Sequence, residues 1–424
     1  MDIVRGIFGM VAILGLAFLM SNNRKAINYR LVGSGLGLQM ILALFILKTE
    51  IGQRVFGTIG HAIEKLLDYS KEGGKFVFGF LGDNAEVSRV VGHPSAVFAL
   101  GILMPTIIFV CVLVAIAYHI GLMQKVVAFI AKGVHAVMGA SGAEATSNVA
   151  SAFVGQVEAQ IMIKPYLSTM TRSELLASMA GSMACIAGGV MAIYISMGIN
   201  AASLLAASLM AAPGALVISK IMYPETEESQ TKGEVKIEVK KAHANLIDAI
   251  SHACSDGLKI SLNVIAMLIG FLALIAMLNG LMGMLGRFLY EHEMYFSGTG
   301  EFTKNLSMEN LLGLVFSGFA WLMGVDSSEI ITAGSLLGKK FVANEFVAYD
   351  SLRGMLKTLS PKTVTILTFA LCGFANLSSV GIQIGGIGEL APERRKELSE
   401  LGLKALIAGT MASYLSATIA GMLV

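Results

Sequence analysis

Apolar runs that approach the length of a membrane span alternate along the chain with short polar turns. A helix needs about 20 predominantly apolar residues to cross a bilayer. The run near 3–20 is followed by a polar turn without a small-residue cleavage site, so we interpret it as a spanning helix rather than a signal peptide. The pattern predicts a polytopic, all-α membrane protein. The eight apolar runs lie near 3–20, 30–48, 96–122, 174–198, 201–222, 261–288, 363–388 and 400–424.

Three other stretches are too polar to span a membrane and too periodic to be loops. In 51–68, apolar residues recur at helical spacing beside charged side chains, which is typical of an amphipathic helix lying in the interface plane. Residues 124–138 and 245–259 show a similar pattern. Residues 223–245 form a long hydrophilic segment rich in Glu and Lys, which we interpret as a linker between two halves.

Composition and charge support the same class. Of the 424 residues, 55% are hydrophobic and 14% are charged, whereas soluble domains carry roughly 25% charged residues. The net charge of +2 argues against nucleic acid as a partner. The four cysteines stand singly, so neither a zinc site nor a disulfide framework is predicted.

Basic residues in short loops predict the orientation in the membrane, because Lys and Arg concentrate on the cytoplasmic side. They occur in the first loop, in the linker and in the loop before the last run, and are missing from the turn at 199–202. With the three basic loops inside, eight spans alternate and both termini lie outside. This arrangement requires 140–170 and 326–358 to enter and leave the membrane on the same side.

Each of these two same-side segments carries a carboxylate in its middle, Glu158 in the first and Glu345 in the second. Each is followed by a span that small or polar residues interrupt, at Cys185–Gly189 and at Phe374–Ser379. This order is typical of transporters built from inverted repeats with broken helices at the midplane. We therefore predict two re-entrant hairpins, each facing a broken helix.

The two acids are the first candidates for function, because an ionised carboxylate at bilayer depth costs about 2.5–3.5 kcal/mol. Gly155 allows a tight turn that presents Gln156 and Glu158 to one ligand. An amide and a carboxylate suit the edge of a nucleobase or an amide-like solute. The alternative is that Glu158 and Glu345 each form an ion pair with a lysine nearby in the sequence.

A second group of candidates lies in the second half. Asn376 and Ser379 stand three residues apart and are predicted to share one helical face. Together with Glu345 they form a cluster suited to the hydroxyls of a sugar, with Phe374 as an apolar wall. The alternative for Asn376 and Ser379 is a structural hydrogen bond between packed helices.

At these residues the sequence resembles the concentrative nucleoside transporters, which import nucleosides with a coupled cation. The resemblance extends from about Asn23 to the C-terminus and implies eight spans, two re-entrant hairpins, interfacial helices and a homotrimer in the inner membrane. It implies that Gln156, Val157 and Glu158 face the base, that Glu345, Asn376 and Ser379 bind the ribose, and that Phe374 lines the pocket. The motifs are Gly155-Gln-Val-Glu-Ala159, Val342-Ala-Asn-Glu-Phe-Val-Ala348 and Leu371-Cys-Gly-Phe-Ala-Asn-Leu-Ser-Ser379, supported by 182–189 and 212–214.

Departures from the family pattern leave the base preference and the coupling ion open. The family often has Thr or Ser where this chain has Val157. Its sodium-coupled members usually have Asn in place of Ser151, and Ser or Thr in place of Cys185, whose thiol is a poor ligand for a hard cation. The carbonyls of Val154 and Ile186 remain as sodium ligands. The side chains favour a proton as coupling ion and the family favours sodium; no other cofactor is expected.

The sequence thus predicts a secondary active symporter that imports nucleosides by alternating access. Two alternatives are a membrane-embedded enzyme that uses Glu158 and Glu345 as acid and base, and a passive nucleoside channel. We divide the chain into scaffold helices with an interfacial helix, a first transport repeat, a cytoplasmic linker with an interfacial helix, and a second repeat with the C-terminal helices. The corresponding ranges are 1–122, 123–222, 223–260 and 261–424.

Overall fold

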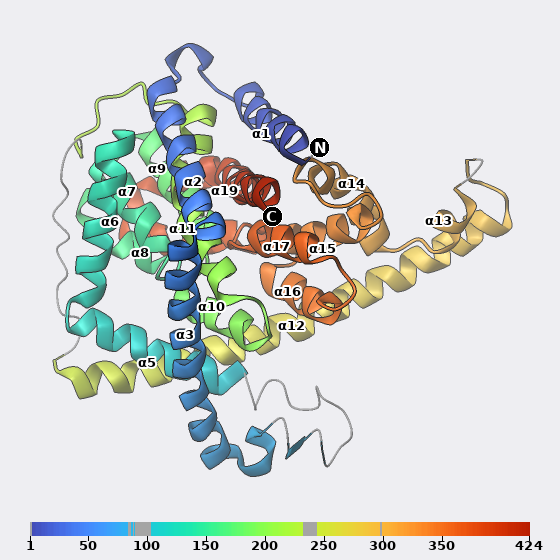
Figure 1. The fold of residues 1–424 in the computed structure, drawn as a ribbon, viewed down its shortest axis with the longest axis horizontal. Coiled ribbons are helices and arrows are strands. Elements are labelled where there is room, and N and C mark those ends of the chain that lie inside the picture. The colour runs from blue at the N-terminus through green and yellow to red at the C-terminus, as the bar shows by residue number, and fades with distance from the viewer. Residues whose placement is uncertain (1, 84–85, 88, 90–102, 232–243, 297–298) are drawn as a thin grey trace.

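The computed structural model describes residues 2–83, 86–87, 89, 103–231, 244–296 and 299–424. Every regular element in these ranges is a helix (Figure 1). The first part of the apolar run at 96–122 and most of the linker predicted at 223–245 lie outside the described residues.

The N-terminal helices follow the predicted pattern closely. Helices α1 (Asp2–Leu19) and α2 (Tyr29–Lys48) coincide with the first two apolar runs. The amphipathic stretch at 51–68 is part of a longer helix, α3 (Glu50–Phe78), whose N-cap Thr49 accepts a hydrogen bond from the Gly52 backbone. Helices α5 (Met104–His119) and α6 (Leu122–Met138) meet at an angle of 76°.

The first predicted hairpin and the broken span after it are both interrupted helices. The chain forms α7 (Gly142–Ser151) and α8 (Glu158–Ile161), then α9 (Arg172–Ala184) and α10 (Gly188–Ser196), and then the continuous α11 (Ala201–Met222). Capping boxes fix the starts of α7 and α9, at Ser141 with Glu144 and at Thr171 with Glu174.

The second half begins with α12 (Leu246–Glu291), a single helix of 46 residues. The amphipathic stretch predicted at 245–259 and the span predicted at 261–288 are thus parts of one continuous helix, because no residue between them breaks it. The remaining helices are α13 (Gly300–Lys304), α14 (Met308–Leu322), α15 (Ile330–Val342), α16 (Glu345–Met355), α17 (Pro361–Leu371), α18 (Leu377–Leu390) and α19 (Arg395–Leu423).

The same order of elements occurs twice. A helix, two short helices joined by a tip, a helix broken in its middle and a continuous helix form α6 to α11, and again α14 to α19. Glu158 and Glu345 are the first residues of α8 and α16. Cys185 and Cys372, each 27 residues after its acid, directly follow the ends of α9 and α17. The acids and the breaks thus occupy corresponding places in the two halves.

Several helices are long and apolar enough to cross a membrane. By length and composition there are five in the described ranges, and six if the bent pair α5–α6 counts as one span. Helices α1, α14 and α17 are apolar but shorter. These helices make the chain a multi-span membrane protein.

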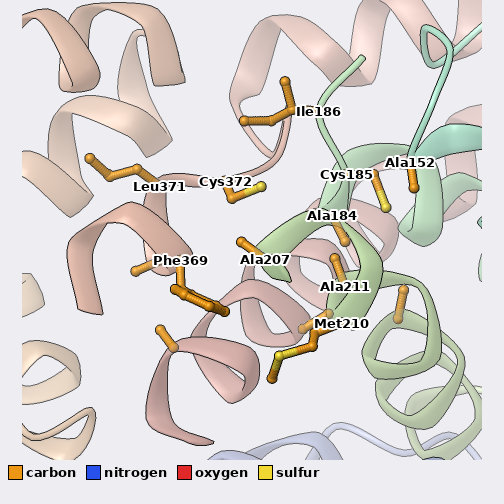
Figure 2. Packing of buried hydrophobic residues seen from close by; sticks show 14 of the residues in the cluster. Ala152, Ala184, Cys185, Ile186, Ala207, Met210, Ala211, Phe369, Leu371 and Cys372 are labelled. Carbon is orange, nitrogen blue, oxygen red and sulfur yellow. The ribbon is translucent and has the colours of Figure 1, made fainter. Parts of the chain in front are cut away.

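The helix breaks are buried in one apolar cluster. Cys185 and Cys372 belong to it together with Ala207 and Ala211 of α11 (Figure 2). Small side chains on α11 let neighbouring helices approach closely, which is how membrane helices gain packing energy. The backbone groups that lack helical hydrogen bonds at the two breaks therefore lie against a closely packed helix, α11.

Candidate functional site

A large cavity brings the predicted substrate-binding residues from both halves together. Its volume is about 1740 Å³, and it lies between the tip that joins α7 to α8, the start of α16 and the break between α17 and α18. A hydrogen bond from the Phe374 backbone N–H to the Cys185 carbonyl, 3.3 Å long, joins the two helix breaks. The cavity lining includes Gln156, Val157, Glu158, Glu345, Phe374, Asn376 and Ser379.

On one side of the cavity, the tip between α7 and α8 is shaped by two glycines. A Cβ atom on Gly155 would lie 2.0 Å from Glu158 Oε2, so only glycine lets this carboxylate fold back over the turn. A Cβ atom on Gly386 of α18 would lie 2.4 Å from a methyl group of Val157. The Gln383 side chain, also on α18, donates a hydrogen bond of 3.3 Å to Gln156 Oε1. These contacts fix the tip against α18.

On the other side, Glu345 is buried and has two hydrogen-bond donors. Tyr194 of α10 donates to Oε1 at 3.2 Å, and the Asn376 amide donates to Oε2 at 3.1 Å. In the described residues neither Glu158 nor Glu345 forms an ion pair with a lysine. The ion-pair alternative therefore does not explain these two acids.

Asn376 has a different position from the one predicted. It is the N-cap of α18 and not a residue within the helix, and its Oδ1 accepts hydrogen bonds from the Ser379 backbone at 2.9 Å and from the Ser378 hydroxyl at 2.7 Å. The cap orients the amide so that Nδ2 points to Glu345. Asn376 and Ser379 still line one cavity, because the N-cap lies beside the first turn of α18, to which Ser379 belongs.

The break before α18 depends on Gly373. Its φ of +124° lies in a region that favours glycine, and a Cβ atom there would lie 2.5 Å from the Ala184 carbonyl oxygen. The close approach lets Phe374 project into the cavity while its backbone bonds to the other break. The geometry of Phe374 and Asn376 is thus tied to the contact between the two broken helices.

The four candidate ion-site residues lie at the end of α7 and at the break between α9 and α10. The Ser151 hydroxyl donates to the Ser147 carbonyl at 2.7 Å and lies 2.9 Å from Ser182 Oγ. Ser208 of α11 joins the two segments, since its hydroxyl donates to the Ala152 carbonyl and its own carbonyl accepts from Cys185 Sγ at 3.7 Å. All four candidates are buried: Ser151, Val154, Cys185 and Ile186.

Two polar residues that support the site were not identified from the sequence. Tyr194 lies in the apolar run at 190–195, and Gln383 lies in the apolar run at 380–387. Both contact acids or amides that are more than 150 positions away in the chain. An isolated polar residue in a predicted span is the only indication that either has a partner in the protein.

Comparisons with known proteins identify the family. Residues 203–421 match the family described as Na+ dependent nucleoside transporter C-terminus, and residues 8–81 match its N-terminal counterpart. Residues 100–201 match a region described as nucleoside recognition. All three matches concern nucleosides.

The relatives cover the whole chain. The uncharacterized transporter YutK of Bacillus subtilis is 43% identical over all of both chains. The nucleoside permease NupC of Helicobacter pylori is 38% identical, covering 99% of this chain and 97% of that protein. Among solved structures, CNTnw in an inward-facing substrate-bound state has a TM-score of 0.91 at 39% identity, covering 100% and 98% of the two chains. A CNTnw variant in an outward-facing state has a TM-score of 0.92, with the same identity and coverage. This chain therefore belongs to the concentrative nucleoside transporter family and is a multi-pass, cation-coupled nucleoside transporter rather than an enzyme.

Proposed function

We propose that the protein is a symporter that imports nucleosides across the inner membrane by alternating access. The observation that carries the proposal is the cavity between the two halves, with an amide and a carboxylate on one side and a carboxylate, an amide and a hydroxyl on the other. A nucleoside has a base with mixed donors and acceptors at one end and sugar hydroxyls at the other. The two sides of the cavity match these two ends.

In this proposal each polar residue has a definite role. Gln156 and Glu158 bind the base, with Val157 beside them, and Glu345 with Asn376 and Ser379 binds the ribose hydroxyls. Buried groups that lose their substrate partner are left unpaired, so a solute without a ribose hydroxyl is strongly disfavoured. Phe374 supplies an apolar wall. Replacing Val157 with Thr adds a hydroxyl near the base, and we expect it to change base preference more than overall rate.

We propose eight membrane crossings. They are the five long apolar helices together with α1, α5 and the broken helix α17–α18. The pairs α7–α8 and α15–α16 then form re-entrant hairpins from opposite sides, within transport repeats at 123–222 and 261–424. The cavity lining also includes Lys164, Ser168 and Glu393, the last next to the basic loop at 394–396. Since basic loops are cytoplasmic, we infer that the cavity opens to the inside.

The coupling ion is sodium or a proton. One pair of substitutions can distinguish these two possibilities. The side chains favour a proton, carried by Glu158 or Glu345, because the Ser151 hydroxyl already bonds to Ser147 and Ser182. Changing Ser151 to Asn and Cys185 to Ser is expected to increase sodium dependence of uptake. A wild type that sodium already stimulates at constant pH contradicts proton coupling.

We also propose a homotrimer. The apolar segment Leu272–Glu291 of α12 is mostly exposed in a single chain, with only 11% of its apolar window buried. Such a surface needs lipid or a second copy against it. Crosslinking in native membranes, followed by mass determination, is expected to give a trimer; a monomer at all crosslinker concentrations contradicts this part of the proposal.

Uptake into proteoliposomes tests the transport function. Radiolabelled uridine and adenosine are supplied under an imposed sodium gradient and then under a proton gradient. We expect unaltered nucleoside to accumulate against its gradient with one of the two ions. Equilibration without accumulation indicates a channel, a chemically changed product indicates an enzyme, and no uptake by folded protein under either gradient contradicts the proposal.

A further inference from the structure

Lys340 is a buried cation that forms no ion pair with a carboxylate in the described residues. It lies on α15 with 1% of its surface exposed. Its ammonium donates hydrogen bonds to two backbone carbonyls at the end of α17, that of Ala370 at 2.9 Å and that of Cys372 at 3.5 Å. A buried charge is costly unless its surroundings compensate it. The compensation here is the end of a helix, where carbonyl groups without helical partners carry partial negative charge. The Cys372 carbonyl also accepts a hydrogen bond of 2.8 Å from the Ser413 hydroxyl.

The neighbouring lysine, Lys339, has different surroundings. Lys339 lies 3.7 Å from Glu309 and 3.3 Å from the Ser351 hydroxyl, on a more exposed side of α15. Two lysines in successive positions thus have separate surroundings, one an ordinary ion pair and the other a helix terminus. Lys339 therefore provides a matched control for any experiment on Lys340.

The end of α17 corresponds to the end of α9 in the first half. Cys185 and Cys372 directly follow these two helices, at the same distance in sequence from Glu158 and Glu345. In the first half, Ser151 at the end of α7 contacts Ser182, close to the end of α9. In the second half the side chain that reaches across from the preceding hairpin helix is an ammonium group. The first half thus has two hydroxyls near this helix end, where the second half has a fixed cation.

We propose that Lys340 is a tethered cation that stabilises the end of α17 from the preceding hairpin helix, α15. It holds the carbonyls at the end of α17 and so positions the break from which Phe374 and Asn376 reach the substrate. It also places a positive charge near Glu345, five residues further along the chain. Lys340 is a positioning residue, and this role rests on the proposed nucleoside site.

Substitutions of Lys340 test whether its charge positions the end of α17. The variants are Lys340→Ala, which leaves room for a small cation, Lys340→Met, which fills the space with an uncharged chain, and Lys339→Met as control. Nucleoside binding to each purified protein is measured by calorimetry in choline chloride and in methylammonium chloride. Choline is too large to occupy the space left by a lysine side chain, and methylammonium resembles the end of that side chain.

In choline chloride we expect Lys340→Ala and Lys340→Met to bind at least tenfold more weakly than the wild type and Lys339→Met. Methylammonium is expected to restore much of the affinity of Lys340→Ala alone. The melting temperature of each variant gives a second readout that does not depend on nucleoside binding. Methylammonium is expected to raise the melting temperature of Lys340→Ala only.

Two results overturn the inference: wild-type affinity in both Lys340 variants, or a loss in Lys340→Ala that is equal in the two salts with no change in melting temperature. If the wild type itself binds neither uridine nor adenosine, the proposed function fails. In that case the melting temperatures still decide whether Lys340 acts as a cation at the end of α17.

Discussion

A methyl group on Gly155 is expected to weaken nucleoside binding strongly while leaving the fold intact. The added Cβ would lie 2.0 Å from Glu158 Oε2 and 2.8 Å from its carboxyl carbon. No real Cβ contact is that short, so the carboxylate must leave its position over the turn. Because the displaced atoms are the far end of a flexible side chain, the backbone of the tip does not have to move.

The size of the effect follows from the contact that is lost. A hydrogen bond to a charged group contributes about 1.5–3 kcal/mol, which corresponds to roughly 10- to 150-fold in dissociation constant. The change in folding stability is expected to be small, because Gly→Ala substitutions in permissive backbone alter the unfolding free energy by about 0.4–1 kcal/mol. Binding and stability are therefore predicted to separate.

Isothermal calorimetry with uridine and adenosine measures the first quantity, and thermal unfolding measures the second. The control is Gly133→Ala in α6, an exposed position where an added Cβ meets nothing within 4 Å. It is expected to leave binding unchanged and to raise the unfolding free energy by up to about 1 kcal/mol, because Ala favours a helix more than Gly does. If Gly155→Ala binds nucleosides as tightly as the control, then the position of the Glu158 carboxylate has no part in recognition and the reasoning is refuted.

Three further substitutions test other parts of the structure. Gly373→Ala places a side chain at a positive φ and against the Ala184 carbonyl oxygen. We expect about 1–3 kcal/mol of strain, which a lower melting temperature would show. Lys220→Met leaves Glu144, its partner at 2.7 Å, buried without a counter-charge; thermal unfolding should show a loss of about 3–5 kcal/mol, partly recovered by adding Glu144→Gln. Tyr194→Phe removes one donor to Glu345, and calorimetry should show binding weakened about tenfold with normal unfolding.

The helices, and the residues at their ends, were predictable where the signal is local. Apolar runs gave α1, α2 and α11 nearly residue for residue, since a span needs a minimum length. The helix starts at Thr171 and Ser360 also have a local signal, because a capping residue bonds to a backbone only three positions away. The cost of a carboxylate at bilayer depth identified Glu158 and Glu345, both of which line the cavity.

Features that depend on distant contacts were not predictable. The continuity of α12 reflects helical propensity in a segment whose polarity changes near residue 260, and polarity alone suggested two elements. The capping role of Asn376 was missed because the residue before a helix and a residue inside it look alike in sequence. Tyr194 and Gln383 find their partners only once the two halves are packed together.

The most direct test of the account pairs altered nucleosides with altered residues. Binding of a nucleoside and of its analogue without ribose hydroxyls is measured by calorimetry for the wild type, Glu345→Gln and Glu158→Gln. We predict that the wild type and Glu158→Gln discriminate strongly between the two ligands, whereas Glu345→Gln binds both weakly and nearly equally. Equal discrimination in all three proteins would mean that Glu345 does not bind the sugar, and would contradict the central claim that the acids of the two halves hold opposite ends of one nucleoside.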